Sequence, residues 1–292
     1  NCISISIIPN LGNSSSCWRH KMFENLALNN LTVRYGSHVL LENLCGSFSR
    51  GQINLVVGRA GSGKSTLLRV LAGFHKEYDG SVEADGVTFV PSGNISLAFQ
   101  NPEALFFNGT VEDEVGYALK MRRMGRDEIE PIARSWLQKW GLDPEKCWHN
   151  HPLELSGGEK RRLALAACTI FMPPVVLFDE PLAGLDAKGQ FALAELLAGM
   201  SSEHIVIVVT HEPEILLEQS GILLYLHSDG CRWFKSAEFL HSALIDRNFF
   251  PLPEWYHNAV GQFAQSSDLP PIKADEVFRY VKKRERMHAD KL

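Results

Sequence analysis

The sequence predicts an α/β fold that carries a helical insertion and a small C-terminal extension. Three largely apolar runs, at residues 53–58, 175–180 and 205–210, have the length and continuity of buried parallel strands. The first run ends in glycine, and the residues that follow at 64–73 place leucines at helical spacing, with Gly73 as the expected C-cap. Short apolar runs that alternate with helical patterns are typical of α/β domains.

The regions around these runs differ in pattern. A strand is expected soon after Met22, and another core strand at 222–226. Between them lies a stretch whose periodicity is helical, with helices expected near 110–124, 127–140 and 157–171. The pattern weakens in the last part of the chain, where prolines break it into short pieces.

These changes predict how the chain is divided. The main domain is expected at 22–228, with the helical subdomain at about 101–172, and residues 229–292 form the extension. Residues 1–21 are rich in Ser and Asn and contain no acidic residue. This composition fits either a targeting segment, such as the remnant of a plastid transit peptide, or a non-native N-terminal segment.

Composition limits the classes of function. The chain has 292 residues and a formal net charge of -5, which argues against duplex nucleic acid as the main ligand. No apolar run approaches the roughly 18–20 residues that span a bilayer, so a membrane role is expected to come through a partner. Six cysteines are scattered without a CxxC pair, which is typical of a reducing compartment.

Residues 58–65 read GRAGSGKS and match the phosphate-binding pattern G-x-x-x-x-G-K-[ST] between an expected strand and an expected helix. Backbone N–H groups and the helix N-terminus supply the anion site there. Lys64 is expected to reach the β- and γ-phosphates, and the Ser65 hydroxyl to bind Mg²⁺. The predicted nucleotide-binding residues of this loop are Gly58, Arg59, Ala60, Gly61, Ser62, Gly63, Lys64, Ser65 and Thr66.

Two acidic residues stand at the end of the strand expected at 175–180. Asp179 is placed to hold the Mg²⁺ and its water shell. Glu180 follows directly and is placed to act as the general base on an attacking water. Together with the phosphate loop, this pair predicts a site for ATP and Mg²⁺ that can hydrolyse the nucleotide.

The segment LSGGEKRR at 155–162 predicts a second anion-binding helix N-terminus. Ser156 is a good N-cap, and Gly157 and Gly158 allow a phosphate to approach the backbone closely. A second such helix is puzzling within one site, because it lacks the lysine of the first. It is explained if Ser156, Gly157 and Gly158 cover the γ-phosphate that another subunit holds.

Over about residues 23–228 the sequence resembles the ATP-binding subunits of the ABC transporter superfamily. The resemblance implies a P-loop NTPase core of ABC ATPase type. It also implies roles for four further residues. Tyr35 corresponds to the aromatic that stacks on adenine, and Gln100 to the glutamine that touches Mg²⁺ and senses the membrane subunit. Asp186 corresponds to the D-loop at the dimer interface, and His211 to the switch histidine at the γ-phosphate.

Within that superfamily, the segments 98–107 and 156–166 are similar to the ATPases of energy-coupling factor importers for vitamins or transition metals. Two departures occur: Glu159 stands where glutamine is commonest, and Arg59-Ala60 stands in the phosphate loop. The resemblance implies a homodimer or a heterodimer with a related ATPase, a transmembrane scaffold and a substrate-capturing membrane protein. It places the chain peripherally at the cytoplasmic face of the membrane, with no nucleic acid as partner.

Two other functions stay open at this point. One is an ABC ATPase that is not coupled to transport, such as a cofactor-assembly factor. The other is a nucleotide-binding regulator without turnover, and the intact set of Lys64, Asp179, Glu180 and His211 argues against it. The apolar residues Leu105–Phe107, just after Gln100, form the expected docking surface for the membrane scaffold; the alternative is that they pack inside the helical insertion.

Overall fold

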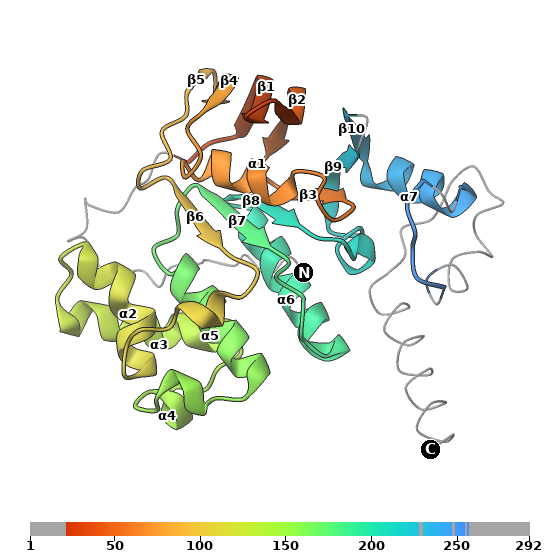
Figure 1. Ribbon diagram of the computed structural model, residues 1–292. Helices are drawn as coiled ribbons and strands as arrows, with labels where there is room; N and C mark the ends of the chain where they lie inside the picture. Colours follow the sequence, from red (N-terminus) through yellow and green to blue (C-terminus); the bar gives the residue numbers. More distant parts are fainter. Residues whose placement is uncertain (1–21, 228–229, 247–248, 255, 257–292) are drawn as a thin grey trace, which may run out of the picture.

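The structure, a computed structural model, describes residues 22–227, 230–246, 249–254 and 256. Both interpretations of residues 1–21, and the prediction for most of the C-terminal extension, therefore lie outside the described residues. Within the described part, two sheets and a group of helices lie in layers (Figure 1). In that part of the chain, none of the helices combines the length and apolarity that crossing a bilayer requires.

The main sheet has six strands in the order β10-β9-β3-β8-β7-β6. Its pairs are parallel except β10 with β9. The strands are β3 (Ile53–Gly58), β6 (Ile95–Ala98), β7 (Val175–Asp179), β8 (Ile205–Val209), β9 (Ser220–His227) and β10 (Gly230–Lys235). The strands expected at 53–58, 175–180, 205–210 and 222–226 are therefore confirmed, with Glu180 and Thr210 just beyond their strands.

A second, four-stranded sheet has the order β2-β1-β4-β5. It is antiparallel throughout and contains β1 (Asn25–Tyr35), β2 (His38–Ser49), β4 (Tyr78–Ala84) and β5 (Val87–Thr88). The strand expected after Met22 is β1. β1 and β2 join through the tight turn at Gly36, whose φ of 59° lies in the left-handed region that glycine adopts freely.

Alternate residues of the central strands face two different cores, as the period of two in a strand requires. In β8, Ile205 and Ile207 pack with the small sheet and α1 (Lys64–Leu71), whereas Val206 and Val208 pack with the other helices. The central strands have no solvent-exposed face, which explains why their sequences are continuously apolar. Figure 1 shows α1 on one side of the sheet and α5 and α6 on the other.

The helices of that second side come mainly from the expected helical stretch. They are η1 (Pro102–Leu105), α2 (Val111–Met121), α3 (Arg126–Lys139), α4 (Pro144–Cys147), η2 (Pro152–Glu154) and α5 (Gly157–Thr169). The helices expected near 110–124, 127–140 and 157–171 are confirmed as α2, α3 and α5. The short α4, which is a single turn, has no periodicity that a sequence reading could use. α6 (Ala187–Ser201) and η3 (Pro213–Ile215) follow β7 and β8.

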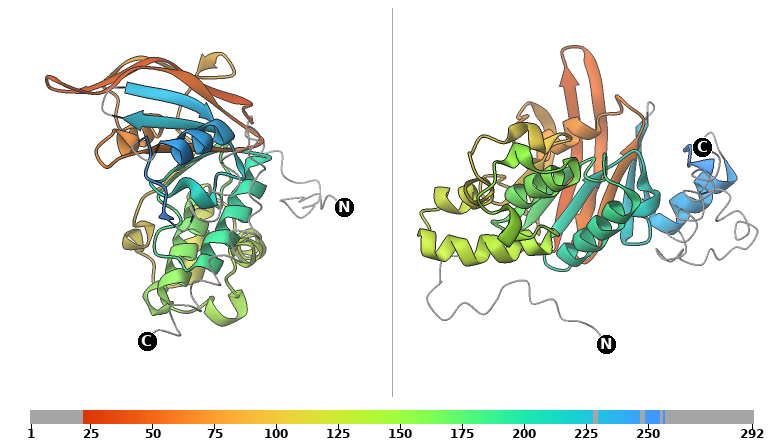
Figure 2. Two further views of the ribbon diagram at one scale, coloured as in Figure 1. Left: turned by 90° about the vertical axis from the view of Figure 1, so that its right-hand side faces the viewer. Right: turned by 90° about the horizontal axis from the view of Figure 1, so that it is seen from below.

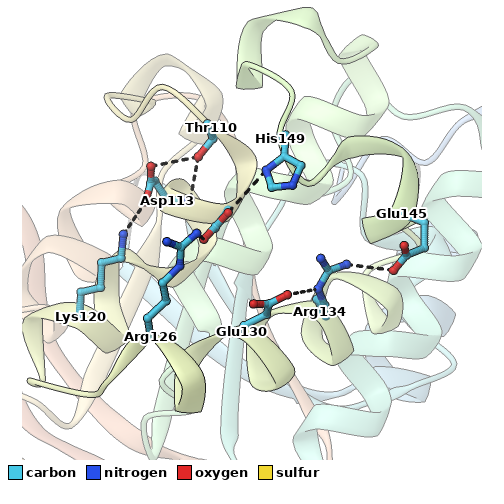
Figure 3. Close-up of polar contacts among 9 residues, drawn as sticks. Thr110, Asp113, Lys120, Arg126, Glu130, Arg134, Glu145 and His149 are labelled. Carbon is cyan, nitrogen blue, oxygen red and sulfur yellow. Dashed lines mark hydrogen bonds and ion pairs between the residues drawn. The ribbon is translucent and has the colours of Figure 1, made fainter.

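The helical subdomain is built differently from the sheet. Its interior contains Trp136 and Trp140, and the Trp136 indole donates a hydrogen bond to the Ala166 carbonyl at 3.0 Å. Its surface carries ion pairs that join successive helices (Figure 3). Arg134 of α3 pairs with Glu130 at 2.8 Å and with Glu145 of α4 at 2.9 Å.

The main sheet continues past the boundary predicted at residue 228. β10 pairs with β9 from Gly230↔His227 to Lys235↔Ile222, and α7 (Ser236–Ile245) packs against both strands through Phe239. Sequence reading placed this segment in the extension because an edge strand with half-exposed residues has a weak apolar pattern. The first part of the predicted extension is therefore one edge of the core sheet (Figure 2).

Candidate active site

The phosphate loop connects β3 to α1 at the carboxyl end of the main sheet. Two of its glycines are required by space and backbone angle. A Cβ on Gly58 would lie 2.2 Å from the Leu226 carbonyl oxygen, and one on Gly63 would lie 2.8 Å from a Leu41 methyl. Both have positive φ, of 155° and 95°. At these two positions the surrounding residues leave no room for a side chain, so the backbone stays bare. Bare backbone N–H groups are what bind a phosphate in loops of this kind.

Lys64 closes this loop from inside. Its ammonium donates to the carbonyl oxygens of Gly58 at 2.7 Å and Arg59 at 2.8 Å. Burial lowers the pKa of Lys64, and the nearby carboxylates of Glu180 and Asp179 oppose that shift. The charge therefore lies between the loop backbone and the acidic pair, where it can pair with phosphate oxygens.

Ser65 and Asp179 meet across the sheet edge. The Ser65 hydroxyl donates to Oδ2 of Asp179 at 3.1 Å. Burial raises the pKa of Asp179, and the hydrogen bond from Ser65 opposes that rise. A hydroxyl and a carboxylate side by side are the hard oxygen ligands that Mg²⁺ prefers, so these two residues fit that ion. The Ser62 hydroxyl fits a polar ligand too, because it is buried without a hydrogen-bond partner among the described residues.

Glu180 directly follows β7, beside the end of β8, and faces His211. Its Oε1 lies 2.7 Å from the Nδ1 of His211, and its Oε2 accepts a longer hydrogen bond of 3.4 Å from the His211 backbone. Glu180 is buried, whereas the imidazole is exposed. The hydrogen bond to Glu180 raises the pKa of His211, so the imidazolium persists to higher pH than in a free histidine.

Gln100 reaches the same edge because β6 runs parallel to β7, with Ala98 beside Phe178. The residue is exposed, and its backbone carbonyl accepts a hydrogen bond from Arg161 of α5. The structure thus joins Ser65 to Asp179 and Glu180 to His211, with Lys64 near both carboxylates, and places Gln100 just beyond the end of the adjoining strand. The roles predicted for these residues remain predictions.

The helix of the LSGGE segment begins as its capping chemistry predicts. Ser156 is the N-cap of α5 and accepts from the Glu159 N–H at 3.4 Å. In return the Glu159 carboxylate accepts from the Ser156 N–H at 2.9 Å and from its hydroxyl at 2.6 Å, which lowers the pKa of Glu159. A Cβ on Gly157 would meet nothing within 4 Å, and one on Gly158 would make only ordinary contacts, at 3.6 Å with the Arg162 guanidinium and 4.0 Å with a Leu185 methyl, so this helix end is open to a further group.

Comparison with known proteins identifies the family in which these sequence elements occur together. The ABC transporter family model matches residues 41–183, which include the phosphate loop, Gln100, the LSGGE segment and both acidic residues. The energy-coupling factor transporter ATP-binding protein EcfA2 of Thermotoga maritima is 37% identical over 219 residues, which cover 72% of this chain and 80% of that protein. The protein of the same name from Lactobacillus delbrueckii is 34% identical, over 68% of this chain and 76% of that protein.

This chain belongs to the ABC transporter ATP-binding family. Solved structures agree on its fold. A structure of cbiO1 from Clostridium perfringens, described as part of the ABC transporter complex cbiONQ, has a TM-score of 0.68 at 24% identity and covers 81% of this chain and 98% of its own. A dimeric bacterial ABC transporter cassette has a TM-score of 0.64 at 26% identity, over 72% and 98% of the two chains. The predicted α/β fold of ABC ATPase type is thus confirmed, and the protein is an ATP-binding ATPase.

Two further residues predicted for the site, Tyr35 and Asp186, make contacts of their own in the structure. Tyr35, at the end of β1, is 48% exposed, and its ring lies against His75, with the ring centroids 5.0 Å apart. An exposed aromatic at this place suits stacking, and adenine binding there remains a prediction. Asp186 caps α6 by accepting from the Gly189 N–H at 2.8 Å, so its carboxylate has a local structural role besides any interface role.

Two residues near the predicted site of this ABC ATPase, His75 and Arg161, could not be predicted from the sequence. His75 lies beside Tyr35 although 40 residues separate them in the chain. Arg161 is buried and contacts both Gln100 and Glu180, yet in sequence it is one of several basic residues at the start of a helix. No local signal distinguishes such a residue, because its partners lie 19 and 61 positions away.

Proposed function

We propose that this ABC ATPase hydrolyses ATP to energise a membrane importer of the energy-coupling factor type, which takes up a vitamin or a transition metal. The observation that supports this most is the contact of Ser65 with Asp179 and of Glu180 with His211 at one sheet edge. Resemblance to energy-coupling factor ATP-binding proteins over most of their length indicates the kind of importer. The partners proposed are a transmembrane scaffold and a substrate-capturing membrane protein.

The chain's own groups account for hydrolysis by position and charge. The phosphate loop and Lys64 bind and orient the β- and γ-phosphates, and Ser65, Asp179 and Gln100 would hold Mg²⁺. That ion would neutralise charge that develops on the phosphate oxygens. Glu180 accepts the proton of the attacking water, and His211 holds the Glu180 carboxylate in place while its charge faces the γ-phosphate.

The site would be completed by a second ATPase subunit, either a copy of this chain or a related chain. Ser156, Gly157 and Gly158 of that subunit would close over the γ-phosphate, with Asp186 at the interface. Two facts support this arrangement. The α5 helix packs on the sheet face opposite α1, and its N-terminus is open to a further group. Because only the ATP-bound state would complete the interface, binding energy could drive the membrane partners.

The test of shared sites uses two damaged subunits. A Gly158→Arg variant should bind ATP as a monomer but not turn over, because the substituted helix end serves the opposite nucleotide. A Lys64→Ala variant should lose ATP affinity. Mixing the two should restore part of the ATPase activity, since one site in each mixed dimer then has both halves intact. A Gly158→Arg monomer that bound no ATP would contradict the shared site.

The membrane contact is proposed at the segment after Gln100. Leu105 and Phe107 are 55% and 65% exposed, whereas Phe106 packs partly against the core. The Phe107 ring meets that of Tyr117 edge-on at 4.7 Å, and Met121 is exposed further along α2. These side chains offer an apolar surface on which a helix of the scaffold could lie. The proposed location is the cytoplasmic face of the membrane, as a peripheral subunit.

Charge placed on this surface tests the importer function. The Leu105→Glu/Phe107→Glu double variant should leave the membrane fraction of cells while its basal ATPase activity stays unchanged. Val87→Glu, at an equally exposed apolar residue of β5, is the matched control and should remain with the membranes. If the wild-type protein never fractionated with membranes, an ABC ATPase not coupled to transport would replace this proposal.

A further inference from the structure

Arg161 is a buried cation at the junction of three segments. It lies on the first turns of α5, and only 5% of the residue is exposed. Its guanidinium donates to the backbone carbonyls of Gln100 and Glu180, and at 3.4 Å to that of Pro181. It also pairs with Oε2 of Glu103 in η1 at 3.2 Å. A buried charge persists where such partners surround it.

One side of this junction holds the backbone of Glu180. That residue has φ of 52°, a left-handed conformation that costs a non-glycine residue energy and needs support from its surroundings. Its N–H donates to the Val209 carbonyl at 2.9 Å, and its own carbonyl accepts from Arg161 and, at 3.2 Å, from the Ala183 N–H. Arg161 is thus the side chain among the described residues that hydrogen-bonds the Glu180 carbonyl.

The other side of the junction reaches the surface. Glu103 belongs to η1, the short helix that ends at the exposed Leu105. Gln100, whose carbonyl Arg161 also binds, precedes that helix. A displacement of η1 would therefore pull on a guanidinium that is bonded directly to the backbone of Glu180. Lysine could not replace this arrangement, because it has no planar fork of five N–H donors.

We propose that Arg161 is a positioning residue, which fixes the orientation of Glu180 and links that orientation to the position of η1. The proposal rests on the function of Glu180 as general base given above. Arg161 itself touches no reacting atom. Through it, a partner that moves η1 would change how well Glu180 is aligned for hydrolysis.

The test is Arg161→Lys in the full-length protein, compared with Arg134→Lys, the same change at a surface ion pair of α3. Arg161→Lys should reduce kcat by about 10- to 100-fold while KM for ATP changes by less than about twofold, since displacement of a catalytic group by roughly 1 Å costs that much. Arg134→Lys should leave both constants unchanged. Equal kcat values for Arg161→Lys and the wild type would overturn the proposal.

A second readout separates positioning from general damage to the fold. Arg161 has no contact with His211 among the hydrogen bonds and ion pairs of the described residues, and the hydrogen bond from Glu180 is the largest cause of the raised His211 pKa, ahead of the charge of Glu212. If Glu180 swings away in Arg161→Lys, the pKa of His211, measured by its imidazole NMR signal, should fall toward its ordinary value. An unchanged His211 titration in a folded Arg161→Lys protein would contradict the proposal.

Glu103→Gln tests the link to η1 and also serves if Arg161→Lys fails to fold. It removes the ion pair on the η1 side and leaves the contacts of Arg161 with Glu180 in place. We expect both effects of Arg161→Lys to recur in Glu103→Gln but to be smaller. The kcat should be about two- to fivefold lower than in the wild type, and the pKa of His211 should fall less than in Arg161→Lys. Wild-type values for both would overturn the link. A wild-type protein without ATPase activity would instead refute the proposed function, so the two failures are distinguishable.

Discussion

The nucleotide-binding sheet and the helical subdomain reach stability by different means. In the sheet, the central strands β3, β7 and β8 are buried along almost their whole length, and the functional groups stand at the strand ends among backbone N–H and carbonyl groups. In the subdomain, amphipathic helices enclose three tryptophans, Trp136, Trp140 and Trp148, and are joined on the surface by ion pairs. The sheet therefore sets the position of reacting groups through its backbone, whereas the subdomain depends on side-chain packing.

This difference predicts which property fails when each region is changed. A substitution at the strand ends should affect turnover with little effect on stability. A substitution inside the subdomain should affect stability first, and surface charges there should matter least.

The largest effect is expected at the strand end. Glu180→Gln should bind ATP with unchanged affinity and hydrolyse it about 10²- to 10⁴-fold more slowly, because the amide cannot accept the proton. Single-turnover hydrolysis and nucleotide titration measure the two quantities. The matched control is Glu112→Gln, which removes a carboxylate from the subdomain surface pair with Arg126 and should keep normal turnover. A Glu180→Gln protein with normal turnover would show that the base assignment is wrong.

The subdomain interior should give the next largest effect, on stability. Trp136→Ala removes a buried indole that packs beside Trp140 and donates to the Ala166 carbonyl. The free energy of unfolding should fall by about 3–5 kcal/mol, as for other large buried aromatics. Urea unfolding measures it, and Trp136→Phe should lose less because most of the volume remains. A loss below about 1 kcal/mol would mean that packing does not dominate this region.

The Glu180–His211 contact should give the fold a pH dependence. Because the pKa of His211 is raised in the folded protein, its imidazolium stabilises the fold fully below the ordinary pKa of 6.5. That contribution is lost as pH rises through the folded-state pKa. The difference in unfolding free energy between wild type and His211→Gln should therefore shrink above about pH 6.5. A difference that grew with pH in urea titrations would contradict the contact.

The smallest effect is expected at the surface of the subdomain. Glu145→Gln removes one ion pair of Arg134, whose nitrogen lies 2.9 Å from a carboxylate that is 82% exposed (Figure 3). Solvent screens such a pair, so the free energy of unfolding should change by less than about 1 kcal/mol. Urea unfolding at low and high salt checks this, with Lys146→Gln, at the neighbouring pair with Asp143, as a comparison. A loss of unfolding free energy as large as that of Trp136→Ala would mean that the surface charges stabilise the subdomain as much as its core does.

The sequence by itself determined the strands at the centre of the sheet, the helices α1, α2, α3 and α5, and the positions of the phosphate loop, acidic pair and LSGGE segment. Each of these can be predicted from residues that are close together in the sequence: an apolar run, a helical period, or a motif within a few positions. The carboxyl ends of parallel strands meet at one edge, so the motifs could also be expected to converge.

Only the tertiary structure decided which side chains touch. Glu180 meets His211 across 31 positions, and Arg161 meets Gln100 across 61. It also decided that Leu105 and Phe107 face solvent while Phe106 packs inward, and that β10 joins the main sheet. Each of these features depends on which surface is covered by residues far away in the sequence. This holds for the edge strand β10, for the different burial of Phe106 and Phe107, and for the buried Arg161. The local sequence pattern does not encode that surface, because the surface forms only when the sheet and the helices pack together.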